Sequence, residues 1–227
     1  MRPTTSLRLA CFPVLCLLGG LWALGAAGCG GSSPAVQSLY YSLQYQAPQP
    51  RPAAKLDTVL TVARLATAPG FNATDMYYGN DQVELASYNY NRWLVTPGDM
   101  VGDFLARDLA ASGCFTAVFS YRDGVDGRFK LQGSVRRFQE LDQGDKARAL
   151  LELSLTLLDT SQASVPRRVM FQRRYRGSAP MAKKDAHSLA TAMSRALAQV
   201  SARVTGDIVR AVARRLAAPA GAKPPRP

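Results

Sequence analysis

The sequence predicts a single α+β domain, in which an antiparallel-rich sheet carries two helices packed on one face. Three observations lead to this fold class. Residues 129–176 contain successive stretches of alternating apolar and polar residues that are joined by short turns. Residues 97–112 and 185–216 instead repeat apolar residues at three- and four-residue steps, as amphipathic helices do. Residues 38–216 are also numerous enough to build one domain with a substantial core.

The N-terminal part of this domain is expected to contribute four strands. Residues 38–45 are rich in tyrosine and leucine, and residues 56–65 contain several branched apolar residues, as strands do. Residues 75–78 and 82–90 flank the sequence Gly-Asn-Asp at 79–81. Gly and Asn tolerate the positive backbone angles of tight turns, so these two segments are predicted to form a hairpin.

The first predicted helix follows the hairpin. Thr96 is placed to cap the helix, Pro97 suits its first position, and Asp99 lies near the positive end of the helix dipole. Gly113 is expected to end it. Asp108 falls within the apolar stripe, and we expect its side chain to turn outward at the helix end. The alternative is an ion pair with an arginine beneath the helix.

The C-terminal part is predicted to be a three-stranded meander closed by a long helix. Residues 114–120 resemble a buried strand that precedes it. The meander strands follow at residues 129–136, 149–157 and 168–176, and the second has the clearest period-two pattern in the chain. Residues 185–216 form the closing helix.

The N-terminal 29 residues have the features of a bacterial lipoprotein signal. Two arginines precede an apolar run of about a dozen residues, as in a secretion signal. The run ends in Ala-Ala-Gly-Cys at 26–29, which resembles the lipobox. The resemblance implies cleavage between Gly28 and Cys29, a diacylglycerol on the Cys29 thiol, and an acyl chain such as palmitate on its new amine. The alternatives are a plain signal peptide with an incidental cysteine, or an uncleaved anchor.

Four segments are therefore expected: a lipoprotein signal peptide at 1–28, a flexible tether at 29–37, the folded domain at 38–216, and a disordered basic tail rich in Pro and Ala at 217–227. Gly30 follows the cysteine, where enteric bacteria place an aspartate to retain lipoproteins in the inner membrane. By that resemblance we expect a lipid-anchored protein of the cell envelope, in the outer membrane and facing the periplasm.

The chain carries a formal charge of +12, and removal of a signal with two arginines and no acid leaves +12 − 2 = +10. Nucleic acid is not expected as a partner, because the protein is predicted to be exported. The anions of the envelope are lipid phosphates, lipopolysaccharide and acidic protein surfaces. Arg173, Arg174 and Arg176 are the candidate contacts for a partner or lipid. The alternative is a solvated strand face.

Catalysis is not indicated, and we assign no catalytic residue. His187 is the sole histidine and is expected on the surface of a first helical turn. The sequence has no nucleophile elbow or phosphate-binding loop. Asp99 and Asp103 could form a carboxylate pair, but an acidic first helical turn explains them better. Cys114 is interpreted as a small buried apolar residue. No metal site is expected, and no cofactor beyond the covalent lipid on Cys29.

Several landmarks resemble one family. Tyr40-Tyr41-x-Leu43 opens the domain, and Met76-Tyr77-Tyr78-Gly79-Asn80 precedes Tyr88-Asn89-Tyr90-Asn91-Arg92-Trp93. Thr96-Pro97-Gly98 then leads into a helix that ends in Leu109-x-x-x-Gly113. Over residues 38–216 this order resembles the ABC-type transport auxiliary lipoproteins, the family that contains the paraquat-inducible lipoprotein C type. Trp93, Tyr88 and Tyr90 serve as its landmarks, and they could equally be residues of the sheet core.

The resemblance implies a non-enzymatic component of an MCE-type ABC lipid transport system that works between the inner and outer membranes. Its expected partners are a periplasmic MCE-domain protein and an ABC permease complex. Whether phospholipid is bound directly stays open, and a ring or other homo-oligomer fits a bridging component. Two alternatives remain: an assembly factor or chaperone for an outer-membrane complex (lipopolysaccharide transport or a porin), and a hydrolase of envelope material.

Overall fold

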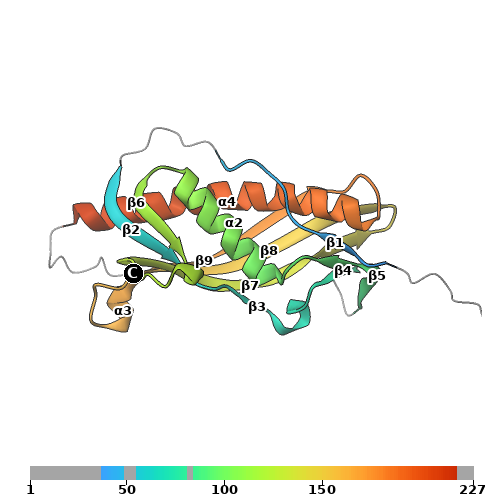
Figure 1. Cartoon of the computed structure of the whole chain (residues 1–227), viewed down its shortest axis with the longest axis horizontal. Helices are drawn as coiled ribbons and strands as arrows, with labels where there is room; N and C mark the ends of the chain where they lie inside the picture. Colours follow the sequence, from blue (N-terminus) through green and yellow to red (C-terminus); the bar gives the residue numbers. More distant parts are fainter. Residues whose placement is uncertain (1–36, 49–54, 81–83, 219–227) are drawn as a thin grey trace, which may run out of the picture. The chain divides into compact units, whose positions relative to one another are not determined.

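The computed structural model describes residues 37–48, 55–80 and 84–218 (Figure 1). The chain divides into two compact units, residues 1–37 and 38–227, and the described elements belong to the second. The signal peptide, the Gly28–Cys29 cleavage site, almost all of the tether and the tail after residue 218 lie outside the described residues. The expectations for these segments therefore stay predictions.

The described part of the second unit is a single α+β domain, as predicted, built around a nine-stranded sheet. The strands are β1 Leu39–Tyr41, β2 Leu56–Val62, β3 Ala66–Thr67, β4 Asp75–Gly79, β5 Leu85–Trp93, β6 Phe115–Ser120, β7 Phe129–Gln143, β8 Lys146–Asp159 and β9 Val169–Pro180. The main strand order is β1-β5-β4-β7-β2-β6, with β3 also on β7, and β8 between β7 and β9. The sheet is mixed, so the prediction of an antiparallel-rich sheet was wrong.

Strand β7 explains why the sheet is mixed. One of its edges pairs antiparallel with β8 along its whole length. The other edge is shared by three short strands that all run parallel to it: β2 at the start, β3 in the middle and β4 near the end. Alternation along a sequence predicts a strand but does not say which distant strand will be its neighbour. These parallel pairings were therefore invisible in the sequence.

The N-terminal strands differ in length from the prediction. Strand β1 has three residues rather than eight, and it pairs parallel with β5. The chain after β1 leaves the sheet: the Gln44 backbone N–H donates to the Ser194 hydroxyl at 2.9 Å, and the Tyr45 ring stacks on Phe104. The predicted hairpin is present as the antiparallel pair β4–β5.

The three-stranded meander β7-β8-β9 is confirmed. Alternate residues of β8 are fully buried: Leu151, Leu153, Leu155 and Leu157. The residues between them lie on the opposite face of the sheet. A single helical turn, α3 Val165–Arg168, connects β8 to β9.

Two longer helices pack against the sheet (Figure 1). Helix α2 Pro97–Ala111 contacts β6 and β7, and helix α4 Ala186–Ala217 contacts β8 and β9. Thr96 is the N-cap of α2 as predicted, but its hydroxyl donates to the Asp99 carboxylate at 2.9 Å. Gly113 follows α2 with a left-handed φ of +63°. None of the described helices is both long and apolar enough to span a membrane.

Asp108 does not turn outward as expected. It is 1% exposed, and its carboxylate accepts hydrogen bonds from Tyr45 at 2.7 Å and from the buried Ser201 of α4 at 2.5 Å. The guanidinium of the neighbouring Arg107 also donates to it, at 2.6 and 2.8 Å. These donors offset the cost of burying a carboxylate, so it can lie within the apolar stripe that faces α4. Asp108 does form an ion pair, but with the adjacent Arg107 of the same helix and not with an arginine beneath it.

Candidate functional site

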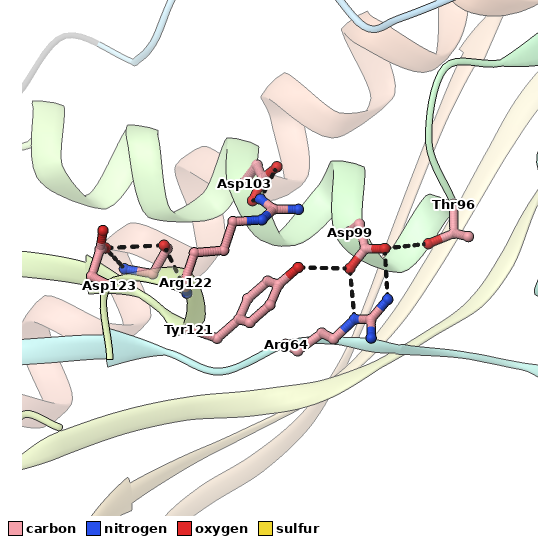
Figure 2. Close-up of polar contacts among 8 residues, drawn as sticks. Arg64, Thr96, Asp99, Asp103, Tyr121, Arg122 and Asp123 are labelled. Carbon is pink, nitrogen blue, oxygen red and sulfur yellow. Dashed lines mark hydrogen bonds and ion pairs between the residues drawn. The ribbon is translucent and has the colours of Figure 1, made fainter. Parts of the chain in front are cut away.

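A polar cluster lies at the start of α2, where three segments meet (Figure 2). The Arg64 guanidinium, just beyond β2, donates two hydrogen bonds to the Asp99 carboxylate at 2.8 and 3.0 Å. The Tyr121 hydroxyl also donates to Asp99, at 3.2 Å. The hydrogen bond from Arg64 is the main reason that the pKa of Asp99 falls to about 2. Asp99 is therefore a carboxylate that is fully engaged by its neighbours.

The second carboxylate of this cluster has its own partner. Arg122 donates to both oxygens of Asp103 at 2.8 and 2.9 Å. The Tyr121 ring lies near both guanidiniums, 5.8 Å from Arg64 and 4.8 Å from Arg122. Since each carboxylate holds a separate arginine, the two are not arranged to share a proton or a metal ion. The cluster stabilises the packing of α2 against the segments that carry Arg64, Tyr121 and Arg122.

The three arginines singled out on β9 do not lie together, because side chains alternate along a strand. Arg173 donates to Asp207 of α4 at 2.8 Å, on the face that the helix covers. Arg174 and Arg176 lie on the other face. There the Arg176 guanidinium lies 3.5 Å from Glu152 of β8. Arg174 and Arg176 therefore face away from α4.

This second face of the meander, the open face, is strongly cationic. Arg137 of β7 lies on the other side of Glu152, at 3.8 Å, so two arginines flank one carboxylate across three strands. Arg148 of β8 also lies here and donates to the Ser178 hydroxyl at 3.0 Å. The open face carries five basic residues, Lys130, Arg137, Arg148, Arg174 and Arg176, of which Lys130 lies away from Glu152, opposite Leu158, and pairs with Asp126. Its excess of positive charge suits an anionic partner.

A shallow groove of about 470 Å³ lies where the β7–β8 turn meets the segment between β9 and α4. Its lining includes Lys146, Arg148, Lys183 and Lys184. Lys184 is already bound, through an ion pair with Asp142 at 2.5 Å. The groove extends the positive charge of the open face toward the end of the sheet.

The aromatic landmarks have three different environments. Trp93 is fully buried, and its ring centre lies 5.0 Å from that of Phe138 in an edge-to-face contact. Tyr88 is half-buried and donates to the Glu140 carboxylate at 2.6 Å, and burial raises the pKa of Tyr88. Tyr90 is exposed. Trp93 is thus a core residue, whereas Tyr90 is free to contact a partner.

The exposed Tyr90 lies in an irregular part of β5 that Arg92 stabilises. The β4–β5 register shifts by three residues between Asp75 and Tyr77, which leaves a bulge in β5. The Arg92 guanidinium donates to the backbone carbonyls of Tyr88 at 2.7 Å and Asn91 at 3.0 Å. Asp75 lies 3.4 Å from the same guanidinium. A bulge held in this way turns a side chain out of the regular sheet.

Sequence reasoning missed a group of exposed apolar side chains around β1 and β5. We call this group the aromatic edge: Leu39, Tyr40, Tyr90 and Leu94. Their exposed fractions are 56%, 65%, 51% and 60%, respectively. The tyrosines of residues 38–45 had indicated only strand propensity. The one available signal was the pair Tyr40-Tyr41, since adjacent strand residues cannot both face the core.

The remaining candidate residues have ordinary environments. Cys114 is buried at the start of β6 and belongs to the hydrophobic core. His187 is exposed in the first turn of α4. In the described part of the chain, no group of three or more His, Cys, Asp or Glu side chains is arranged to hold a metal ion.

Comparison with known families decides the broad identity of this domain. Residues 41–205 match the family described as the ABC-type transport auxiliary lipoprotein component. The chain belongs to this family. The resemblance noted in the sequence is therefore confirmed, and the match runs from the last residue of β1 through most of α4.

Solved structures of related proteins support the same fold. The domain is similar to protein XCC0632 from Xanthomonas campestris, a DUF330 protein, with a TM-score of 0.71 and 24% identity over 80% of this chain and 100% of that one. It is also similar to an uncharacterized protein, with a TM-score of 0.57 and 16% identity over 76% and 99% of the two chains. No curated protein matches the sequence. This auxiliary lipoprotein therefore shares its fold with proteins of distant sequence.

Proposed function

We propose that this auxiliary lipoprotein is cleaved after Gly28, lipidated on Cys29, and held in the outer membrane facing the periplasm. There it serves an MCE-type ABC lipid transport system as a non-enzymatic component. Membership of the ABC-type transport auxiliary lipoprotein family carries this proposal. The lipobox-like sequence at 26–29 and Gly30 after the cysteine support its anchoring and its location.

The open face is our candidate surface for the transport partner. Arg174 and Arg176 project from a strand whose other face is covered by α4, so their charges are directed away from the core. Glu152 neutralises part of this charge, and the surrounding basic residues leave a positive excess. We propose that an acidic surface of the MCE-domain protein or a phospholipid headgroup binds here.

The carboxylates of Asp99, Asp103 and Asp207 are engaged in contacts that support a binding role rather than catalysis. Asp99 and Asp103 each bind an arginine through both oxygens, and Asp207 accepts from Arg173 and Tyr175. A general acid or base needs a pKa near the working pH and access to substrate. The pKa of Asp99 lies instead at about 2. These groups stabilise the fold.

The test is to solubilise the membranes gently, isolate the C-terminally tagged full-length protein, and identify what accompanies it. An MCE-domain protein together with an ABC permease is the expected result. Co-purification of a β-barrel protein without those components would contradict the proposal and favour a role in assembly of an outer-membrane complex. A Cys29→Ala variant is expected to lose its membrane attachment and its contribution to lipid balance. If the soluble Cys29→Ala protein still restored lipid balance fully, the anchor would not be needed for function.

Charge reversal tests the open face separately. Arg174→Glu is expected to reduce recovery of the partner, and the loss should grow when Arg176→Glu is added. Arg214→Glu is the matched control, because Arg214 is an exposed arginine on α4 and the charge change is the same. Equal recovery with all variants would exclude the open face as the docking surface and leave the family role in place.

A further inference from the structure

The aromatic edge has a geometry that strand propensity does not explain. In the β1–β5 ladder, Tyr41 lies beside Trp93, and Tyr40 lies beside Arg92. Tyr41 packs against the core with Trp93, so Tyr40 lies on the opposite, outer side of the sheet. The Leu94 backbone N–H donates to the Tyr41 carbonyl at 2.8 Å, which extends the ladder by one residue. Leu94 therefore follows Arg92 on the same outer side.

Tyr90 enlarges this surface, and Leu39 is exposed beside it at the start of the edge strand. Tyr90 belongs to the bulge that Arg92 holds, and it is half exposed. Leu39 begins β1, which pairs with β5 and ends the strand order of the sheet. Tyr40, Tyr90 and Leu94 thus form an exposed group along the β1–β5 ladder, and Leu39, which alternates with Tyr40, is exposed at the end of the edge strand. Groups of exposed apolar side chains on a folded domain are typical of surfaces that bind a protein, a membrane or a ligand.

The position of this surface in the chain indicates what it binds. Leu39 lies ten positions after Cys29 in the sequence. Even when fully extended, this stretch spans at most about 35 Å. If Cys29 carries lipid, as in the proposed function, β1 is the first element of the domain above the membrane. The tether therefore keeps the aromatic edge within reach of the bilayer surface.

We propose that the aromatic edge is the membrane-contact surface of the anchored domain and that it binds the interfacial region of a phospholipid bilayer. This inference rests on the lipid anchor of the proposed function. Tyrosine suits that region because its ring is apolar and its hydroxyl is polar, and leucine adds apolar area. The alternative occupant, a strand of another protein, has only three residues of β1 to pair with, fewer than the five or six of an average strand.

The experiment places a fluorescent probe on this surface in the full-length lipidated protein. Tyr40→Trp and Leu94→Trp each add one tryptophan at an exposed position, and the buried Trp93 is common to all variants. Val165→Trp is the matched control, since Val165 is 68% exposed. Val165 lies at another part of the sheet. It follows Asp159, the end of β8, which pairs with the start of β7. Strand β4, which pairs with β5, instead lies beside the last part of β7. Each variant is reconstituted into phosphatidylethanolamine–phosphatidylglycerol vesicles with or without brominated phosphatidylcholine.

The expected result is loss of the added emission with brominated lipid for Tyr40→Trp and Leu94→Trp, together with a blue shift on reconstitution. Val165→Trp should keep its emission. Equal quenching of all three variants, or of none, would overturn the inference. Shielding that requires a second protein and not lipid would overturn it in favour of a protein interface. These measurements contain no ABC permease. The membrane-contact proposal can therefore be contradicted while the transport role stands, and the transport role can be contradicted while membrane contact stands. An intact mass without lipid on Cys29 would remove the premise of both proposals.

Discussion

The Tyr45 hydroxyl lies 2.7 Å from the Asp108 carboxylate, and this contact joins the segment after β1 to helix α2. Arg107 adds to the attachment, because it donates to the Tyr45 carbonyl at 3.1 Å and its guanidinium lies 4.5 Å from the Tyr45 ring. The Ser201 hydroxyl brings α4 to the same carboxylate. One buried acid thus connects three segments that are far apart in the sequence.

Replacement of this acid should be costly. We expect Asp108→Ala to lower the free energy of unfolding by about 3 kcal/mol, because it leaves the buried Ser201 hydroxyl and the Tyr45 hydroxyl without their acceptor. Asp103→Ala is the control, since the Asp103–Arg122 pair is exposed and should contribute less than about 1 kcal/mol. Urea denaturation measures both. Equal losses would show that Asp108 does not connect the segments energetically.

The Asp99–Arg64 contact predicts a dependence on acid. The pKa of Asp99 is lowered to about 2, so its stabilising contribution is complete above the ordinary carboxyl pKa and is lost as the pH falls toward 2. Wild type should therefore be more stable than Asp99→Asn at pH 7, and the difference should shrink between pH 4 and pH 2. Urea midpoints across this range measure it. A difference that stays constant would contradict the assignment.

The Tyr88–Glu140 pair predicts the opposite dependence. Burial raises the pKa of the Glu140 carboxyl above its ordinary value. The unfolded chain therefore releases this proton at a lower pH than the folded protein, and stability falls as the pH rises through the folded pKa. Glu140→Gln should be free of this loss, so it should gain stability relative to wild type as the pH rises. Thermal midpoints of both proteins from pH 4 to pH 8 give the comparison, and parallel curves would exclude the effect.

Helix α4 approaches β9 closely at Gly177. A Cβ atom there would lie 2.7 Å from both the Ala196 carbonyl oxygen and the Val200 methyl group. We expect Gly177→Ala to displace α4 and to cost about 1–3 kcal/mol in the free energy of unfolding. Gly70→Ala is the control, because no atom lies within 4 Å of a Cβ at that position. If the two variants unfold alike, α4 can move away from the sheet without cost.

Periodicity predicted the local elements well because each element is set by neighbouring residues. The meander, the β4–β5 hairpin and the long helix α4 all appear where alternation or three- and four-residue steps placed them. The mixed sheet was missed because it depends on β2, β3 and β4 pairing with the distant β7. Such pairings are determined by the packing of the whole domain.

The candidate residues were harder to predict for a related reason. We grouped Arg173, Arg174 and Arg176 because they are close together in the sequence. Side chains alternate along β9, however, so Arg173 lies on one face of the sheet and the other two lie on the opposite face. Asp108 was expected in solvent because its partners, Tyr45 and Ser201, lie far away in the sequence. A charge is easy to locate in a sequence, but its neighbours are determined by tertiary structure.

The shared edge of β7 also constrains the order in which this domain can fold. The pairs β2–β6 and β4–β5 have no ladder with each other, and β7 is the strand that joins them into one sheet. A nascent chain that ends before residue 129 would hold two separate ladders, the pair β2–β6 and the short ladder β1–β5–β4, and it would lack the strand that joins them. The first half of the domain therefore cannot complete its sheet before the meander is synthesised. If the chain is exported as proposed, this dependence on β7 delays completion of the sheet until the meander is present.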